Sequence, residues 1–247
     1  MAYLLSNGHQ LYYREKGTGE LLLILPGNTA SSASHIDDID YFGEYYHTVS
    51  LDFWGTGKSD RVNNWTRNWW VEATKDAVSL IEHLNYDKAS IIGCSGGAAI
   101  GLLMAALYPS KVRSVIADSE LDQYPSDLIQ LCIEERKSKS KEQLDFWKSA
   151  HGDDWEDIVQ KDTNLMLDLA INGHVFKDKL QDITCPVLFC GSLEEENYVP
   201  NFTETIIKMT KQIKRAELFL VNDGNHPLMW TCKDQFRRMT LSFLHNI

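Results

Sequence analysis

Short runs of consecutive apolar residues alternate along this chain with segments of helical periodicity. Runs such as Leu21 to Leu25 are bounded by Pro, Gly or Asp, as in Pro26-Gly27. Continuous apolar runs of this length are typical of parallel strands buried on both faces. The spacing of apolar residues over 66–84 predicts a helix with one face on a sheet. The expected strands are 21–25, 47–51, 89–92, 112–117, 186–190 and 217–221, and the expected closing helix is 234–244.

Two further strand-like runs open the chain and are joined by Asn7-Gly8, a dipeptide that favours a tight hairpin turn. Together with the six apolar runs they make eight strands. Strands that alternate with helices imply right-handed crossovers between parallel neighbours. The sequence therefore predicts an α/β fold with a doubly wound, mostly parallel eight-stranded sheet.

The alternation of strands and helices stops between about Gln123 and Asp182, where the pattern indicates several short helices. We expect a core formed by 1–122 and 183–247, with an inserted helical unit at 123–182. The densest charge run of the insertion, at 134–142, has mixed signs, which favours a solvated helix end or connector over a docking patch.

Composition narrows the function classes. Apolar residues make up 43% of the 247 residues, and 24 basic against 35 acidic residues give a net charge of -11. Such a field repels phosphate backbones and anionic lipid, so we expect neither a nucleic-acid nor a membrane partner.

The first ten residues lack the features of a signal peptide, which favours a cytoplasmic protein. Five cysteines without CxxC spacing indicate free thiols, with no disulfide framework and no metal site.

The strongest chemical motif is Gly93-Cys94-Ser95-Gly96-Gly97, which fits the G-x-S-x-G pattern. It lies between an expected strand and an almost wholly apolar helix, where flanking glycines permit the sharp turn that exposes a serine. A serine nucleophile also needs a base, a group that orients the base, and N–H donors for the oxyanion. The context therefore predicts Ser95 as a nucleophile.

Five segments give the chain its resemblance to the α/β-hydrolase superfamily: LLLILPGN, LDFWGTGKSD, IIGCSGG, LFCGSLEEENYVP and DGNHP. The chain resembles this family over its whole length except the insertion, which looks like the family's variable cap. It departs from the common pattern at Pro26, where many members have histidine, at Phe53-Trp54 in place of an arginine, and at Asn225 in place of a glycine before His226.

The resemblance implies a nucleophile, acid and histidine in that order, which assigns the base to His226, 131 residues after Ser95. Three consecutive glutamates compete for the acid, and we select Glu195 over Glu194 and Glu196. Asp118 is an alternative, because some members of the family place their acid at that strand end.

The resemblance also implies a pocket around the nucleophile. It assigns the oxyanion donors to the backbone N–H groups of Gly96 and Asn28. Trp54, Tyr124 and Trp147 are expected to line the substrate pocket under the cap.

A second glycine-rich segment, Gly55 to Ser59, ends like a phosphate-binding loop. That motif requires glycine where Asp52 stands, and no helix is expected after Ser59. A dinucleotide fingerprint fails as well, since it needs glycine at Asp60. Nucleotide binding is therefore not predicted.

These observations predict a cofactor-independent serine hydrolase that cleaves a small or medium-sized ester, thioester or related acyl substrate through an acyl-enzyme. A small-molecule acyl compound is the expected partner, and the sequence does not define the oligomeric state. Three alternatives stay open: an acyltransferase, a C–C bond hydrolase on the same triad, and a receptor-like protein that binds a ligand without turnover.

Overall fold

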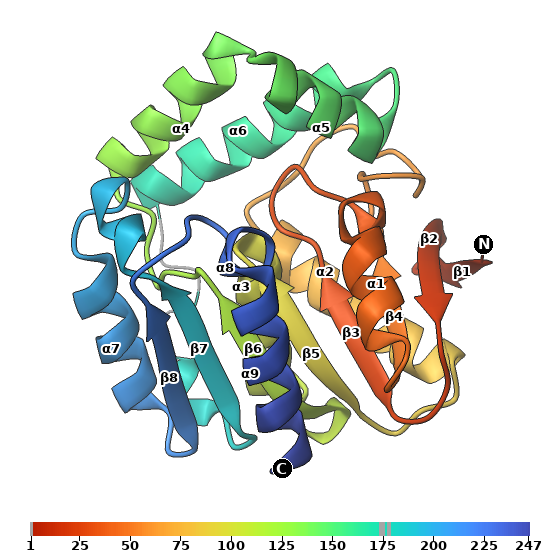
Figure 1. Ribbon diagram of the computed structural model, residues 1–247. Helices are drawn as coiled ribbons and strands as arrows, with labels where there is room; N and C mark the ends of the chain where they lie inside the picture. Colours follow the sequence, from red (N-terminus) through yellow and green to blue (C-terminus); the bar gives the residue numbers. More distant parts are fainter. Residues whose placement is uncertain (1, 173–175, 177–178) are drawn as a thin grey trace.

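The computed structural model describes residues 2–172, 176 and 179–247, which include most of the predicted insertion. Eight strands form one sheet in the order β1-β2-β4-β3-β5-β6-β7-β8 (Figure 1). The pairs β1–β2 and β2–β4 are antiparallel, and the other neighbours are parallel. The strands are β1 (Ala2–Ser6), β2 (His9–Lys16), β3 (Leu21–Leu25), β4 (His47–Leu51), β5 (Ala89–Cys94), β6 (Val112–Asp118), β7 (Val187–Ser192) and β8 (Ala216–Val221).

Helices cover both faces of the sheet, and three more lie across its carboxyl edge. Figure 1 shows α1 and α9 on the near face, and α4, α5 and α6 above the strand ends. The bounds are α1 (Ile36–Phe42), α2 (Trp69–His83), α3 (Gly96–Leu107), α4 (Ser126–Ser138), α5 (Lys141–His151), α6 (Trp155–Asn172), α7 (Phe202–Gln212), α8 (Leu228–Thr231) and α9 (Lys233–His245).

Strand β3 shows why the central runs are apolar throughout. Leu21, Leu23 and Leu25 pack into the core cluster shared with α2, α3 and α7, whereas Leu22 and Ile24 pack into the cluster shared with α1 and α9. Successive side chains of a strand point to opposite faces, so a strand covered on both sides needs apolar residues at every position. The doubly wound, mostly parallel eight-stranded sheet predicted from the sequence is confirmed.

Several predicted boundaries move by one to three residues. The helix expected from Thr66 begins at Trp69, after a turn in which the Trp69 N–H donates to the Thr66 carbonyl. The strand expected at 186–190 runs on to Ser192, which pairs with Val221. The extension follows from β8, because Gly191 and Ser192 complete the ladder with it.

The helices above the sheet, α4 to α6, form the part of the insertion that we call the cap. Trp147 of α5 stacks on Trp155 of α6 with ring centroids 5.3 Å apart. Arg136 of α4 donates to Asp162 of α6 at 2.7 Å, and the carboxylate is almost fully buried. These contacts join the three helices into one layer.

The glycine-rich turn after β4 encloses a carboxylate of its own chain. Lys58 N–H and Ser32 N–H donate to the two oxygens of Asp52 at 2.7 and 2.6 Å. Gly57 has φ +51°, and a Cβ there would lie 2.0 Å from Asp52 Oδ2. Burial raises the pKa of Asp52, although these N–H groups oppose the change. The interior of this turn is therefore filled by a carboxylate of the chain itself.

Two alanine substitutions should distinguish the cost of backbone strain from the cost of the close approach between residue 57 and the Asp52 carboxylate. Gly8 also has positive φ, but a Cβ there meets nothing within 4 Å. We expect Gly8→Ala to lower the free energy of unfolding by about 1–2 kcal/mol, the cost of a left-handed alanine. Gly57→Ala should lower it by about 3 kcal/mol or more, since it also displaces a buried carboxylate. Urea denaturation measures both, and equal losses would contradict the role of Asp52.

Candidate active site

Ser95 forms the turn between β5 and α3. Its backbone has φ 51° and ψ -126°, a strained conformation for a residue with a side chain. Its N–H donates to the Asp118 carbonyl of β6 at 2.8 Å. The ladder between β5 and β6 thus continues into the turn and holds it in place. The Ser95 side chain lines a cavity beneath the cap.

Asn28 and Gly96 lie against each other beside Ser95. A Cβ at Gly96 would be 2.0 Å from Asn28 Oδ1 and 3.4 Å from the Asn28 backbone nitrogen. A Cβ at Gly27 would be 3.4 Å from the Ser95 Cβ. Glycine at 96 and 27 therefore allows the loop after β3 to approach the serine turn closely, with both predicted oxyanion residues at the point of contact.

His226 and Glu195 are hydrogen bonded. Glu195 lies in the single 3₁₀ turn Leu193–Asn197, and its Oε2 is 3.0 Å from Nδ1 of His226. The other carboxylate oxygen accepts Ser119 Oγ at 2.8 Å and Ser192 N–H at 3.1 Å. Only 1% of the glutamate side chain is exposed, whereas 43% of the histidine is accessible. The pair thus has a buried acid end and a histidine end that lines the cavity.

The Glu195 carboxylate and the His226 imidazole interact electrostatically. Burial disfavours the charged imidazole, but the hydrogen bond and negative charge of Glu195 outweigh this and raise the pKa of His226. With Nδ1 directed at the carboxylate, Nε2 is the nitrogen left for another partner.

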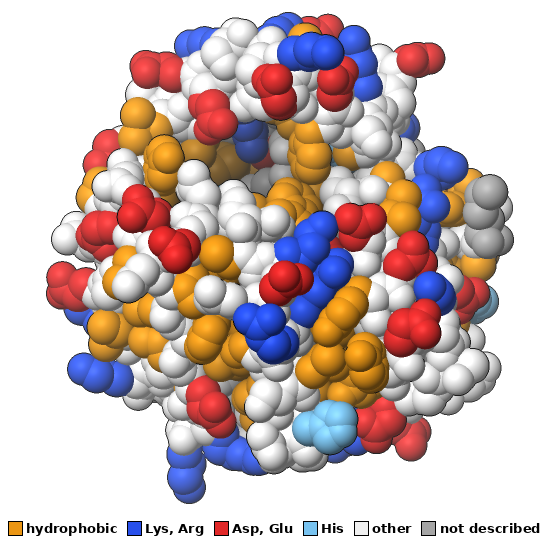
Figure 2. Space-filling view, viewed as in Figure 1, with side chains coloured by type: hydrophobic (Ala, Val, Ile, Leu, Met, Phe, Trp, Pro, Cys, Tyr) orange, Lys and Arg blue, Asp and Glu red, His pale blue; other side chains and the backbone are white. Residues whose placement is uncertain are grey.

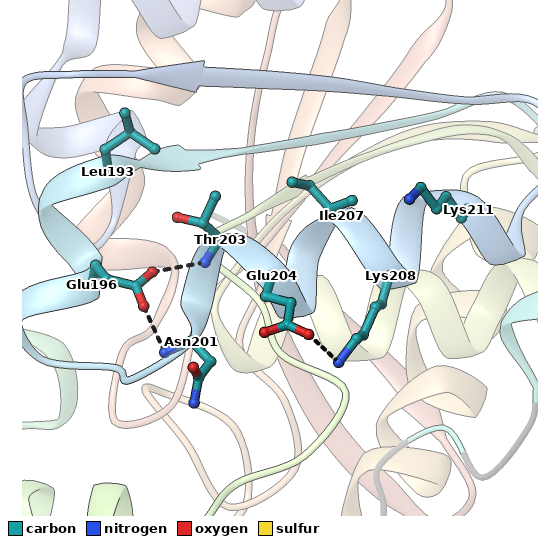
Figure 3. A pocket seen from close by; sticks show the side chains of 8 residues that line it. All are labelled: Leu193, Glu196, Asn201, Thr203, Glu204, Ile207, Lys208 and Lys211. Carbon is teal, nitrogen blue, oxygen red and sulfur yellow. Dashed lines mark hydrogen bonds and ion pairs between the residues drawn. The ribbon is translucent and has the colours of Figure 1, made fainter.

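The other two glutamates of the run have different partners. Glu194 Oε2 accepts Asn197 Nδ2 at 2.8 Å. Glu196 accepts the N–H groups of Asn201 and Thr203 at 2.7 and 3.0 Å, which lowers its pKa and caps α7. Figure 3 shows these hydrogen bonds of Glu196 with Asn201 and Thr203 at one end of an open groove along α7. Of the three glutamates, Glu195 is the one hydrogen bonded to His226.

Asp118, the alternative acid, lies one layer deeper. Its Oδ2 accepts the Met229 N–H of α8 at 2.8 Å, and Ser119 Oγ is 3.1 Å from its Oδ1. Burial raises the pKa of Asp118 to about 7. The Ser119 hydroxyl is within hydrogen-bond distance of both the Asp118 and the Glu195 carboxylates, so it links the two buried acids.

The cavity between sheet and cap has a volume of about 700 Å³. Figure 2 shows it as a hollow beneath α4 to α6. Ser95, Asn28 and His226 line its floor, and Tyr124 and Trp147 line its wall as expected from the sequence. The remaining lining is mainly apolar and includes residues that sequence reasoning missed: Leu121, Leu128, Leu131, Phe146, Met166, Val199, Phe202 and Trp230.

Trp54 corrects the sequence prediction, because it is not one of the described residues that line this cavity. Its ring stacks on His9 with centroids 3.8 Å apart, and its carbonyl accepts the Trp69 Nε1–H at 3.2 Å. The turn after β4 thus places the Trp54 side chain against the amino-terminal hairpin. The missed cap residues gave only a weak signal, since apolar positions on a short helix are equally typical of a core.

In residues 2–172, 176 and 179–247, no group of three or more His, Cys, Asp or Glu residues is placed to hold a metal ion. All five cysteines are free thiols. In the same ranges, no helix combines the length and apolar character needed to span a membrane.

A family model for the alpha/beta hydrolase fold matches residues 20–167, more than half of the chain. The chain belongs to this family and is a hydrolase. Serine hydrolase BPHL of Mus musculus is 27% identical over 256 aligned residues, which cover 96% of this chain and 84% of the relative. The (E)-2-((N-methylformamido)methylene)succinate hydrolase of Acinetobacter baylyi is 22% identical over 97% of this chain and 96% of its own length.

Among solved structures, a serine hydrolase involved in carbazole degradation, the CarC enzyme, superposes with a TM-score of 0.80 at 18% identity. The superposition covers all of this chain and 98% of that one. At this identity the likeness concerns the fold alone.

The coupling between Glu195 and His226 can be measured directly. In Glu195→Gln the hydrogen-bonded carboxylate charge is lost, so the pKa of His226 should fall below its value in the parent protein. NMR titration of the imidazole protons measures this pKa. Glu194→Gln, one residue away, is the matched control and should leave it unchanged. An unchanged pKa in Glu195→Gln would contradict the assignment.

Proposed function

We propose that the protein hydrolyses a small or medium-sized carboxylic ester or thioester, with Ser95 as nucleophile, His226 as base and Glu195 as orienting acid. The observation that carries this proposal is the 3.0 Å contact between Glu195 and His226 at the edge of the cavity that Ser95 lines. A serine hydroxyl is a weak nucleophile, and a histidine held by a buried carboxylate is the usual means of activating it.

The proposed reaction has two halves. His226 Nε2 accepts the hydroxyl proton of Ser95 as its Oγ attacks the substrate carbonyl carbon. The resulting oxyanion accepts N–H groups of Asn28 and Gly96, and His226 then protonates the departing alcohol or thiol. Water, deprotonated by His226, then attacks the acyl-enzyme, and the imidazolium returns the proton to Ser95 Oγ as the bond to the acyl carbon breaks and the acid is released. Glu195 stays ionised and stabilises the imidazolium in both halves.

The lining of the cavity favours a substrate with an uncharged acyl group. Most of its lining is apolar or aromatic, and its charged residues on the cap are Glu135 and Arg136. Arg136 is already bonded to Asp162 at 2.7 Å and to Thr163 Oγ1 at 2.6 Å. A substrate carboxylate would have to share this guanidinium with Asp162 and would lie near Glu135.

A second candidate is cleavage of a C–C or related bond in an acidic substrate. The A. baylyi relative is named for a succinate derivative, and Arg136 supplies a cation on the cavity wall. A panel of neutral acyl esters and monoesters of dicarboxylic acids separates the two candidates. Preference for the acidic esters would favour the second. Product formation with an added alcohol acceptor would indicate acyl transfer, and absence of all turnover would favour a binding protein.

Substitution of the three residues tests the proposal. We expect Ser95→Ala and His226→Ala each to lower kcat for p-nitrophenyl acetate by about 10⁴-fold or more, and Glu195→Gln by about 10²–10⁴-fold. Glu194→Gln should stay within about twofold of the parent. A fluorophosphonate should label the parent on the peptide that contains Ser95 and should not label Ser95→Ala.

The pH profile provides a second readout of the same roles. Since only the neutral imidazole accepts the serine proton, kcat/KM should fall on the acid side. Its midpoint should equal the His226 pKa that the NMR titration measures, and the Glu195 carboxylate is expected to raise this pKa above the usual histidine value. Full activity in any of the three substituted proteins would remove that residue from the mechanism.

A further inference from the structure

Thr29, the residue after Asn28, has a backbone conformation that is unfavourable for a β-branched residue. Its φ is +58°, in the left-handed region, and it is the third residue of a turn closed by Ala30 N–H to the Gly27 carbonyl at 3.1 Å. Glycine or asparagine is the usual residue at such a position. A β-branched side chain there is disfavoured by about 1–2 kcal/mol. Contacts from elsewhere must therefore hold the turn.

Those contacts come from the cap. Trp147 Nε1–H donates to Thr29 Oγ1 at 3.2 Å, and His151 Nε2 is 3.0 Å from the Thr29 carbonyl oxygen. The two side chains are one helical turn apart on α5 and so lie on one face of it. Ser31 Oγ adds a bond to the Ala150 carbonyl at 2.8 Å. The end of α5 is thus bonded to the loop at Thr29 and at Ser31.

The proton on His151 is fixed by its two backbone partners. Gly57 N–H donates to Nδ1 at 3.0 Å, so Nδ1 is the acceptor and Nε2 carries the proton that Thr29 accepts. The ring is 5% exposed. Burial lowers the pKa of His151 to about 4, with Arg61 acting in the same direction and the Thr29 carbonyl and Asp154 opposing it. The ring is therefore neutral at neutral pH, as both bonds require.

We propose that His151 and Trp147 are positioning residues of the oxyanion hole: by fixing Thr29 in its left-handed conformation, they hold the Asn28 N–H where the oxyanion forms. This inference rests on the proposed function, in which Asn28 is a donor. Removal of one oxyanion donor typically lowers kcat by 10²–10³-fold, and a misplacement of about 1 Å can lower the rate about 10²-fold. A contact that only anchored the cap would not act on the transition state in this way.

Two substitutions at position 151 separate the hydrogen bond to Thr29 from the hydrogen bond to Gly57, because each keeps one of them and removes the other. The nitrogen of a glutamine side chain reaches the place of Nε2, so His151→Gln keeps a donor for Thr29. The oxygen of the shorter asparagine reaches the place of Nδ1, so His151→Asn keeps only the acceptor for Gly57. Arg67→Gln is the matched control, because it removes a different contact between core and cap, the ion pair with Asp168 at 2.7 Å.

We expect His151→Asn to lower kcat for p-nitrophenyl acetate by about 10–100-fold with KM within about threefold. Affinity for a trifluoromethyl ketone, which forms an oxyanion adduct with the serine, should fall by the same factor as kcat/KM. His151→Gln and Arg67→Gln should stay within about threefold of the parent. Equal kcat in the Asn and Gln proteins, or a change confined to KM, would overturn the proposal.

A second variant covers the case in which His151→Asn fails to fold. Trp147→Phe keeps an aromatic ring in the cap but lacks the N–H that Thr29 Oγ1 accepts, and kcat should fall about 3–10-fold at constant KM. We call the contacts of Trp147 and His151 with Thr29 the clamp. An unchanged kcat in Trp147→Phe would then contradict a role of the clamp in catalysis.

Hydrogen–deuterium exchange gives a readout that does not depend on activity. The peptide covering residues 26–33 should exchange at least about tenfold faster in His151→Asn or Trp147→Phe than in Arg67→Gln. If Ser95 takes no fluorophosphonate label, the proposed function fails and exchange alone decides whether the clamp exists. If labelling succeeds and exchange is unchanged, the clamp is wrong and the proposed function stands.

Discussion

The buried carboxylate of Glu195 is the interaction on which the arrangement of the site depends. An ionised carboxylate away from water is strongly unfavourable unless donors surround it. Here Ser119 follows β6, Ser192 ends β7 and His226 follows β8, and each of the three donates to this one carboxylate. Satisfying the charge therefore fixes the carboxyl ends of three neighbouring strands relative to one another. The imidazole is positioned as part of the same arrangement.

A second buried carboxylate organises the other side of Ser95. Asp52 accepts N–H groups from the loop after β3, through Ser32, and from the turn after β4, through Lys58. The same turn donates to His151 through Gly57. Asp52, which accepts backbone N–H groups, and Glu195, which accepts two side chains and one backbone N–H, thus hold the two sides of the site, and Ser95 lies between them at the end of β5.

Sequence reasoning found the parts of the site that local pattern determines. The elbow at Ser95 needs glycines at fixed offsets between a strand and a helix, so it is visible in five residues. The choice among three consecutive glutamates depends instead on the phase of a single 3₁₀ turn, in which Ser192 caps the turn and Glu195 points back inwards. Counting along the chain cannot fix that phase.

Contacts between distant segments were beyond the same reasoning. Trp54 was expected at the substrate pocket because of its place after a strand end, but the turn around Asp52 directs it to His9. The link between Thr29 and His151 joins residues 122 positions apart. Neither residue belongs to a motif, so only the three-dimensional structure associates them.

The arrangement of the cap also determines where the cavity meets solvent. The end of α5 is bonded to the loop after β3, and Lys161 of α6 donates to the Val62 carbonyl at 2.7 Å. On the opposite side, Leu131 of α4 and Tyr198 line the cavity and are each 53% exposed. A residue that is both cavity lining and solvent exposed marks an opening, so the opening lies between α4 and the turn that carries Glu195. Glu135 and Asn197 also line the cavity and are exposed, so the rim is mixed, and under the proposed function a substrate passes it before its acyl group is buried against the mainly apolar lining.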